Sequence, residues 1–259
     1  MKTHRHTLSK KRRGFTLVEL LVVIAIIAAL AGLAIVGVRT GLRAADAAST
    51  STNMKDIYGS LSAISAEGVN TGLHAPGTLP PYKGSLQDEQ EASFVWWDLV
   101  AEKMDLADRD SGDYRWISAY SETKLQNPLS KKQLGAGKTT FDSLYNDPEL
   151  SHGGYAYNAE LGGDISSEDQ DENAYRVRLS AIEDPNNTIY FGEADDNQDT
   201  AGWVFKNMAN APQGNYKDSA HCCMVGGNIK LIKNIHLKER GSFDYYTQFE
   251  DKNYSNNPE

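Results

Sequence analysis

Residues 10–27 read KKRRGFTLVELLVVIAII, and this stretch decides the fold. Four basic residues end at Gly14, and an apolar run then extends from Phe15 to Val38. Glycine aside, the only side chains in the run that are not apolar are Thr16 and Glu19. Its length matches the ~20 apolar residues that a membrane-spanning helix needs. A carboxylate there costs roughly 2.5–3.5 kcal/mol at the bilayer centre, which indicates that Glu19 has a partner.

The sequence resembles the processing and methylation signal of type IV prepilins and type II secretion pseudopilins, since Gly-Phe-Thr-Leu-Val-Glu leads directly into this apolar run. In that family a prepilin peptidase cuts after the glycine and methylates the new amino terminus. The resemblance implies cleavage between Gly14 and Phe15, and it makes Glu19 the fifth residue of the mature chain. A freed ammonium at Phe15 and a Glu19 carboxylate on the neighbouring subunit would then neutralise each other where either alone is expensive.

Three other interpretations of the N-terminal segment stay open. A secretory signal peptide also has a basic start and an apolar core, and Ala29-Leu30-Ala31 offers a cleavage site, although Glu19 would interrupt the core. Arg12-Arg13 suggests a twin-arginine signal, whose apolar region is usually milder than this one. An ordinary single-pass membrane anchor explains the hydrophobicity of the segment but gives no reason for the presence of Gly14 and Glu19.

The charge of the chain is distributed unevenly. Its formal net charge is −9, and the leader holds six of the 26 basic residues and no acidic ones. The mature chain therefore carries 20 basic against 35 acidic residues, or −15. A basic leader favours retention in the cytoplasm while the acidic body crosses the membrane. A body this acidic also argues against a broad nucleic-acid-binding face, so no nucleic acid partner is expected.

A single long helix is predicted from about Phe15 to Ala66. Met54, Ile57, Leu61 and Ile64 recur at steps of three and four, which is the stripe of an amphipathic helix. We expect residues 15–40 to form the membrane-spanning and polymerising half of this helix, and residues 41–66 to form its amphipathic half. Residues 1–14 would be the cleaved leader and residues 67–259 the globular head.

The head is expected to combine helix and sheet. Residues 87–106 place apolar side chains at near-helical spacing and predict a short helix. Short β-rich runs bounded by turn residues predict strands at 114–120, 154–158, 175–179, 188–192 and 228–232. Asp184-Pro185-Asn186-Asn187 has the composition of a turn. The predicted fold class is α+β: a long N-terminal helix packed against a small antiparallel β-sheet head with long loops.

The C-terminal third resembles a pilin-like group in three segments: Tyr155–Asn158, Leu179–Pro185 and the strand Thr188–Glu193. That group also carries a terminal His-x9-Asp-Gly motif, from which this chain departs, since Tyr216 stands in place of the histidine and Gly226 in place of the aspartate. Any bonds that this pair makes in the group are therefore in doubt here.

Nothing in the sequence points to an enzyme. The adjacent Cys222 and Cys223 are explained either as two buried side chains on a strand or as a vicinal disulfide. No serine or cysteine has the local context of a catalytic nucleophile. Four scattered histidines fit satisfied structural positions better than catalysis, and they are His74, His152, His221 and His236.

Two acidic runs could bind calcium, whose six to eight ligands are carboxylates and carbonyls. One covers residues 164–173, and the other covers Glu193 to Asp199, where Asp195, Asp196 and Asp199 are the candidate metal ligands. Major pseudopilins of type II secretion have a calcium-bound C-terminal loop, and the resemblance implies the same possibility here. Neither run fits an EF-hand, so solvated acidic loops are the competing explanation.

The sequence thus predicts a structural subunit of a type II secretion pseudopilus or type IV pilus-like fibre. The expected partners are a prepilin peptidase, other pilin or pseudopilin subunits and the bacterial inner membrane, which the chain would cross once with its head in the periplasm or in an extracellular fibre. A membrane-anchored binding protein or adhesin that does not polymerise is the alternative.

Overall fold

The structure, a computed structural model, describes residues 15–68, 76–85, 93–106, 124–130, 154–165, 177–194, 204–205 and 211–239. The chain divides into two compact units, residues 1–44 and residues 45–259, and each is described by itself. The predicted strand at 114–120 lies outside the described residues.

In the first unit, the described residues belong almost entirely to helix α1 (Leu17–Glu67), which continues into the second unit. Its side chains are exposed from Phe15 to Ala44. The large apolar side chains between Phe15 and Leu42 are between 46 % and 83 % exposed. α1 is long and apolar enough to cross a membrane, and none of its most apolar stretch is buried within the structure. The predicted single helix is confirmed within one or two residues at each end.

In the second unit, the rest of α1 packs against the head along one stripe. The buried positions Ala47, Thr50, Met54, Ile57, Leu61 and Ile64 recur at steps of three and four, and Ser65 is buried beside Ile64. This stripe contains the four residues from which amphipathicity was predicted. The helix ends where Gly68 takes a positive φ of 82° and its N–H donates to the Ile64 carbonyl, a common helix C-terminus for glycine.

The head is built on a five-stranded sheet in the order β6-β3-β5-β7-β8. Its strands are β3 (Tyr155–Asn158), β5 (Ile189–Glu193), β6 (Val204–Phe205), β7 (Ser219–Met224) and β8 (Ile229–Lys233). All neighbours run antiparallel except β3 and β6, which are parallel, so the sheet is mixed rather than wholly antiparallel as predicted. The α+β class is confirmed.

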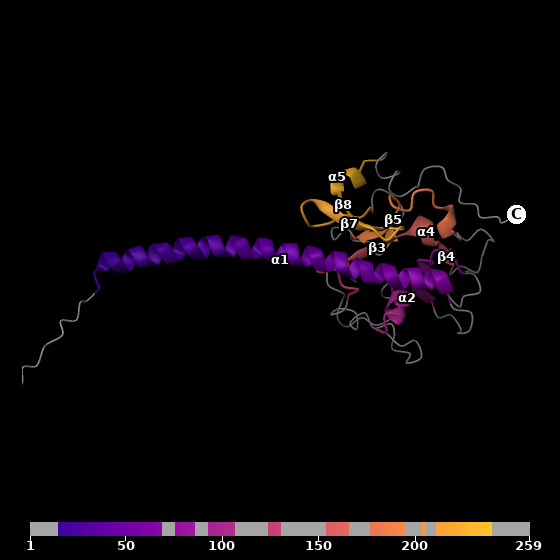
Figure 1. Cartoon of the computed structure of the whole chain (residues 1–259), viewed down its shortest axis with the longest axis horizontal. Helices are drawn as coiled ribbons and strands as arrows, with labels where there is room; N and C mark the ends of the chain where they lie inside the picture. Colours follow the sequence, from indigo (N-terminus) through magenta and orange to yellow (C-terminus); the bar gives the residue numbers. More distant parts are fainter. Residues whose placement is uncertain are drawn as a thin grey trace, which may run out of the picture. The chain divides into compact units, whose positions relative to one another are not determined.

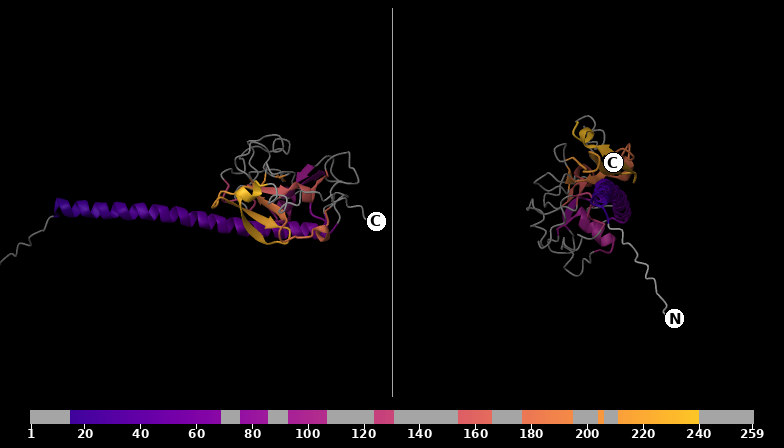
Figure 2. Two further views of the ribbon diagram at one scale, coloured as in Figure 1. Left: turned by 90° about the horizontal axis from the view of Figure 1, so that it is seen from above. Right: turned by 90° about the vertical axis from the view of Figure 1, so that its left-hand side faces the viewer.

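One face of this sheet is covered by the second half of α1, with helix α2 (Trp96–Lys103) beside it (Figures 1 and 2). The buried core there contains Met54, Ile57 and Leu61 of α1 together with aromatic side chains of the head. Trp96 lies 5.5 Å from Tyr157 and 6.0 Å from Phe191, measured between ring centroids. A second apolar cluster on β3, β5, β6, β7 and β8 includes Ala156, Phe205 and Met224.

A second, three-stranded sheet has the order β2-β1-β4, formed by β1 (Lys83–Ser85), β2 (Ser93–Val95) and β4 (Asp164–Ile165). The helix predicted at 87–106 is therefore too long, because Ser93–Val95 pairs with Lys83–Ser85 before α2 begins. The Asp98 carboxylate accepts a hydrogen bond from the Val95 N–H at 2.9 Å, which caps the new helix start.

The strand predicted at 175–179 is wrong over its described part, Val177 to Leu179. Arg178 forms a single bridge with Thr78, and a 3₁₀ turn follows at Leu179–Ala181. The segment opposite it has proline at 76 and 80, two positions from Thr78 in each direction. Proline has no N–H to donate to a ladder, so the pairing cannot extend.

The remaining predictions for the C-terminal third are confirmed where they are described. The strands near 155, 189 and 229 are β3, β5 and β8, and the Asp184 carbonyl accepts hydrogen bonds from Asn187 N–H and Thr188 N–H in the predicted turn. Gly226, which stands where the similar group has aspartate, acts through its backbone, since its N–H donates to the Pro185 carbonyl at 2.7 Å.

Candidate functional site

The N-terminal end of α1 carries two of the three predicted processing and assembly residues. Phe15 is 83 % exposed, and Glu19 lies in the first turn. Gly14 lies outside the described residues. The sequence around Glu19 therefore presents an exposed aromatic residue, one acid and a continuous apolar surface on one helix.

Glu19 closes a capping box with Thr16. Its carboxylate oxygen Oε2 accepts hydrogen bonds from Thr16 N–H at 2.8 Å and from Thr16 Oγ1 at 2.9 Å. In return, Glu19 N–H donates to Thr16 Oγ1 at 3.2 Å. This Thr-x-x-Glu arrangement satisfies N–H groups at the helix start that have no intrahelical acceptor. A negative charge at this end also interacts favourably with the helix dipole.

The capping box explains how an apolar helix tolerates an acid in its first turn. From the sequence, Glu19 was expected to have a partner only on another subunit, whereas the structure shows a partner within the chain, Thr16. The threonine at 16 was noted as an exception to the apolar run, and its spacing of three from Glu19 was the signal for the box. The carboxylate is held next to residues 15 and 16, where cleavage after Gly14 would create a new amino terminus.

The apolar side chains from Phe15 to Leu42 form a continuous exposed hydrophobic surface. A surface of this kind marks contact with another protein or with a membrane. Because every side chain in the stretch is exposed around the whole helix, the surface fits lipid or several neighbouring helices better than one flat partner.

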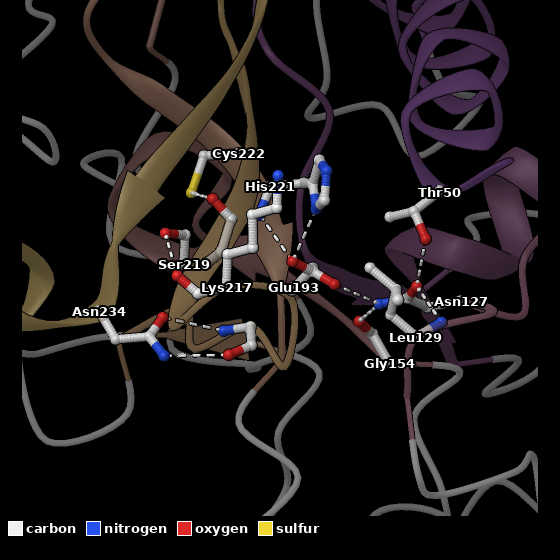
Figure 3. Close-up of polar contacts among 12 residues, drawn as sticks. Thr50, Asn127, Leu129, Gly154, Glu193, Lys217, Ser219, His221, Cys222 and Asn234 are labelled. Carbon is white, nitrogen blue, oxygen red and sulfur yellow. Dashed lines mark hydrogen bonds and ion pairs between the residues drawn. The ribbon is translucent and has the colours of Figure 1, made fainter. Parts of the chain in front are cut away.

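A second site, which the sequence analysis missed, is a buried polar cluster around Glu193. Figure 3 shows the Glu193 carboxylate between His221 and Asn127. Its Oε2 accepts from the His221 backbone N–H at 2.6 Å and lies 3.0 Å from His221 Nδ1. Its Oε1 accepts from Asn127 Nδ2 at 3.2 Å. A carboxylate only accepts, so the His221 ring donates through Nδ1–H.

Asn127 extends the cluster to α1. Its Oδ1 accepts from Thr50 Oγ1 at 2.8 Å and from Leu129 N–H at 3.0 Å. Its Nδ2 also donates to the Gly154 carbonyl at 3.2 Å, just before β3. Thr50, Asn127, Glu193 and His221 are each at most 6 % exposed. The cluster therefore joins α1, the segment 124–130, β3, β5 and β7 inside the head.

The described residues around Glu193 pack closely against its side chain. Gly214 lies against the Glu193 carboxylate. A Cβ at position 214 would crowd this carboxylate and would lie 2.6 Å from Ala220 Cα. Both carboxylate oxygens accept hydrogen bonds from the protein. The cluster is thus suited to holding five segments of the head together.

Glu193 also corrects the sequence interpretation of the acidic runs. It was grouped with Asp195–Asp199 as a solvent-facing or calcium-binding residue, but it is the last residue of β5 and 2 % exposed. Asp195, Asp196 and Asp199 lie outside the described residues, so their calcium binding stays a prediction. Among the residues that the structure describes, no group of three or more His, Cys, Asp or Glu side chains could hold a metal ion.

The two cysteines lie on β7 with their side chains in different apolar clusters, Cys223 in the one that contacts α1 and Cys222 in the other. Both are free and fully buried. Neighbouring residues of a strand point to opposite faces, which rules out the vicinal disulfide in this conformation. Burial raises the pKa of the Cys223 thiol to about 12 and that of the Cys222 thiol well above its ordinary value.

In a comparison with protein families, residues 9–35 match the prokaryotic N-terminal methylation motif. Comparison of the chain with curated proteins and with solved structures gave no match. Carried on an apolar N-terminal helix, the motif is consistent with a type IV pilin or pseudopilin precursor. It implies processing by a prepilin peptidase and assembly with pilin subunits, and the helix suggests anchoring in a membrane as a single pass.

Proposed function

We propose that the chain is a structural subunit of a type II secretion pseudopilus or type IV pilus-like fibre. The observation that carries the proposal is the methylation motif at residues 9–35 on a helix whose apolar side chains are exposed all around. Such a surface needs a membrane before assembly and neighbouring helices after it.

In this proposal a prepilin peptidase of the bacterial inner membrane cuts after Gly14. The basic leader stays in the cytoplasm, and the acidic head lies in the periplasm or in an extracellular fibre. Cleavage converts Phe15 into a free ammonium one residue before the capping box. The protein acts by assembling and not by catalysis.

Glu19 then has two alternative roles. In the single subunit its carboxylate caps the helix through Thr16. In the fibre it neutralises the Phe15 ammonium of the next subunit, because two unpaired charges in an apolar interior cost far more than a pair. The pairing would set the axial register between subunits.

The buried Glu193 cluster supports the same function from the other end of the helix. A fibre subunit transmits force between its helix and its head. An apolar stripe alone resists sliding weakly, since hydrophobic contact is not directional. The Thr50–Asn127 hydrogen bond and its continuation to Glu193 are directional, and they fix one position of α1 on the head.

Co-expression with a prepilin peptidase tests the proposal. Intact-mass analysis should give a mature chain that begins at Phe15 with a methylated amino terminus, and the processed protein should pellet with sheared fibres. A chain that is cleaved but stays in the membrane would favour the non-polymerising adhesin. A chain that begins at Gly32 would indicate an ordinary signal peptide and overturn the proposal.

A further inference from the structure

Two arginines, Arg39 and Arg43, follow the apolar part of α1 at the end opposite the basic leader. The run from Phe15 to Val38 would span about 36 Å at 1.5 Å per residue, slightly more than the ~30 Å hydrocarbon core of a bilayer. With the helix in a membrane, Arg39 therefore lies at the level of the far headgroups, and Arg43 follows one turn later.

Both arginines are exposed on α1, four positions apart and so on one face of the helix. Among the residues that the structure describes, neither guanidinium has a hydrogen bond or an ion pair. The nearby Thr40 hydroxyl is already satisfied, since its Oγ1 donates to the Val36 carbonyl at 3.0 Å. The two guanidinium groups are thus the polar groups at this level that still need partners.

Arg39 and Arg43 lie on the side of the apolar run where positive residues are usually few. Positive residues near a span favour the cytoplasmic side, where the leader already has six, and two more beyond the other end weaken that asymmetry. The body that follows is strongly acidic and would be repelled by an anionic membrane surface. Arginine suits a phosphate partner, because its planar fork can donate two parallel hydrogen bonds to phosphate oxygens.

We propose that Arg39 and Arg43 bind the phosphate groups of anionic phospholipid at the far face of the membrane and so hold α1 at a fixed depth before assembly. This rests on the membrane insertion in the proposed function and not on polymerisation. The competing partner is a carboxylate on a second copy of the chain. The lipid is favoured because the length of the apolar run places both arginines at the headgroups.

Native mass spectrometry of the full-length protein in detergent, with equal amounts of phosphatidylglycerol and phosphatidylcholine, tests this. Both lipids carry a phosphate, but only phosphatidylglycerol has a net negative charge. Wild type should retain phosphatidylglycerol preferentially. Arg39→Gln with Arg43→Gln should lower the preference roughly 25-fold, at about fivefold for each arginine. The leader contributes equally to both proteins, so the difference between them is the measured quantity.

Lys233→Gln with Lys238→Gln is the matched control, since it removes two exposed charges from the head. It should keep the wild-type preference. Equal retention by wild type and the arginine variant would overturn the proposal, and so would an equal loss in the lysine control. An arginine variant that binds lipid normally but forms no fibres would assign the arginines to subunit contacts and also overturn it. Failure of the proposed function shows separately, as wild-type protein that is not cleaved or forms no fibres while the phosphatidylglycerol preference persists.

Discussion

Replacing Glu193 by glutamine should destabilise the head strongly although it changes the shape of the side chain very little. The glutamine can place its oxygen toward the two His221 donors or toward Asn127, but not toward both. Asn127 cannot flip in response, because its Oδ1 already accepts from Thr50 and Leu129 and its Nδ2 donates to Gly154. Either orientation sets a donor against a donor in a buried site.

The better orientation keeps the His221 hydrogen bonds and loses the one from Asn127. A buried donor left without its acceptor costs about 1–3 kcal/mol, and hydrogen bonds to a charged group are worth roughly 1.5–3 kcal/mol. We expect a loss of about 2–3 kcal/mol in the free energy of unfolding. Thr50→Val removes only one neutral hydrogen bond of the same cluster, and it should cost about 1 kcal/mol.

Urea denaturation of the full-length protein in a mild detergent measures these values, with fluorescence of the buried Trp96 reporting on the core. Glu239→Gln is the matched control, because Glu239 is 61 % exposed and 3.7 Å from the exposed His236. That change should stay within about 0.5 kcal/mol. If Glu193→Gln is no more destabilising than Glu239→Gln, the buried cluster does not hold the head together and the reasoning fails.

Two further outcomes are expected from the structure and one from the N-terminal motif. Gly214→Ala should lower the free energy of unfolding by about 1–3 kcal/mol in the same urea assay, because a Cβ there would lie 2.6 Å from Ala220 Cα and crowd Glu193. Gly59→Ala is the control and should not destabilise the protein, because a Cβ at that position would have no other atom within 4 Å. Burial raises the pKa of the Cys223 thiol to about 12. The stability that the neutral thiol contributes should therefore be complete below pH 9 and should fall as the pH rises toward 12. If the urea midpoint of Cys223→Ala falls over this pH range as much as that of wild type, the prediction is contradicted. Gly14→Val should leave the chain uncleaved by a prepilin peptidase, and a mass that still begins at Phe15 would show that the glycine is not required.

The long helix could be predicted because its signals are local and repeat. An uninterrupted apolar run predicts one half, and a stripe at steps of three and four predicts the other. Thr50 and Ser65 are buried on the same stripe but are polar, so hydrophobic spacing did not include them. Strands β3, β5 and β8 of the main sheet were also predictable, because each is a short β-rich run bounded by turn residues.

The polar cluster was not predictable in the same way, because its members are far apart in the chain. Thr50 and Asn127 are separated by 77 positions, and Glu193 and His221 by 28. Glu193 resembled its acidic neighbours in composition, and only its place at the end of a β-rich run distinguished it. The strand predicted at 175–179 failed for a related reason, since the prolines that stop its pairing lie about 100 residues earlier.

In the proposed fibre, subunits assemble through the charge of Glu19, and the yield of fibres from variants at this residue measures that dependence. Glu19→Val removes both the charge and the capping box, whereas Glu19→Gln keeps an oxygen that can accept from Thr16 and removes only the charge. Each variant should be inserted and cleaved after Gly14, because neither makes the span less apolar. The measurement is the amount of processed subunit in sheared fibres from cells without wild-type protein. Both variants should be nearly absent from the fibres, since stranding one member of a desolvated ion pair costs roughly 3–5 kcal/mol. Normal fibres from Glu19→Gln would show that the acid serves only to cap its own helix and would contradict the account.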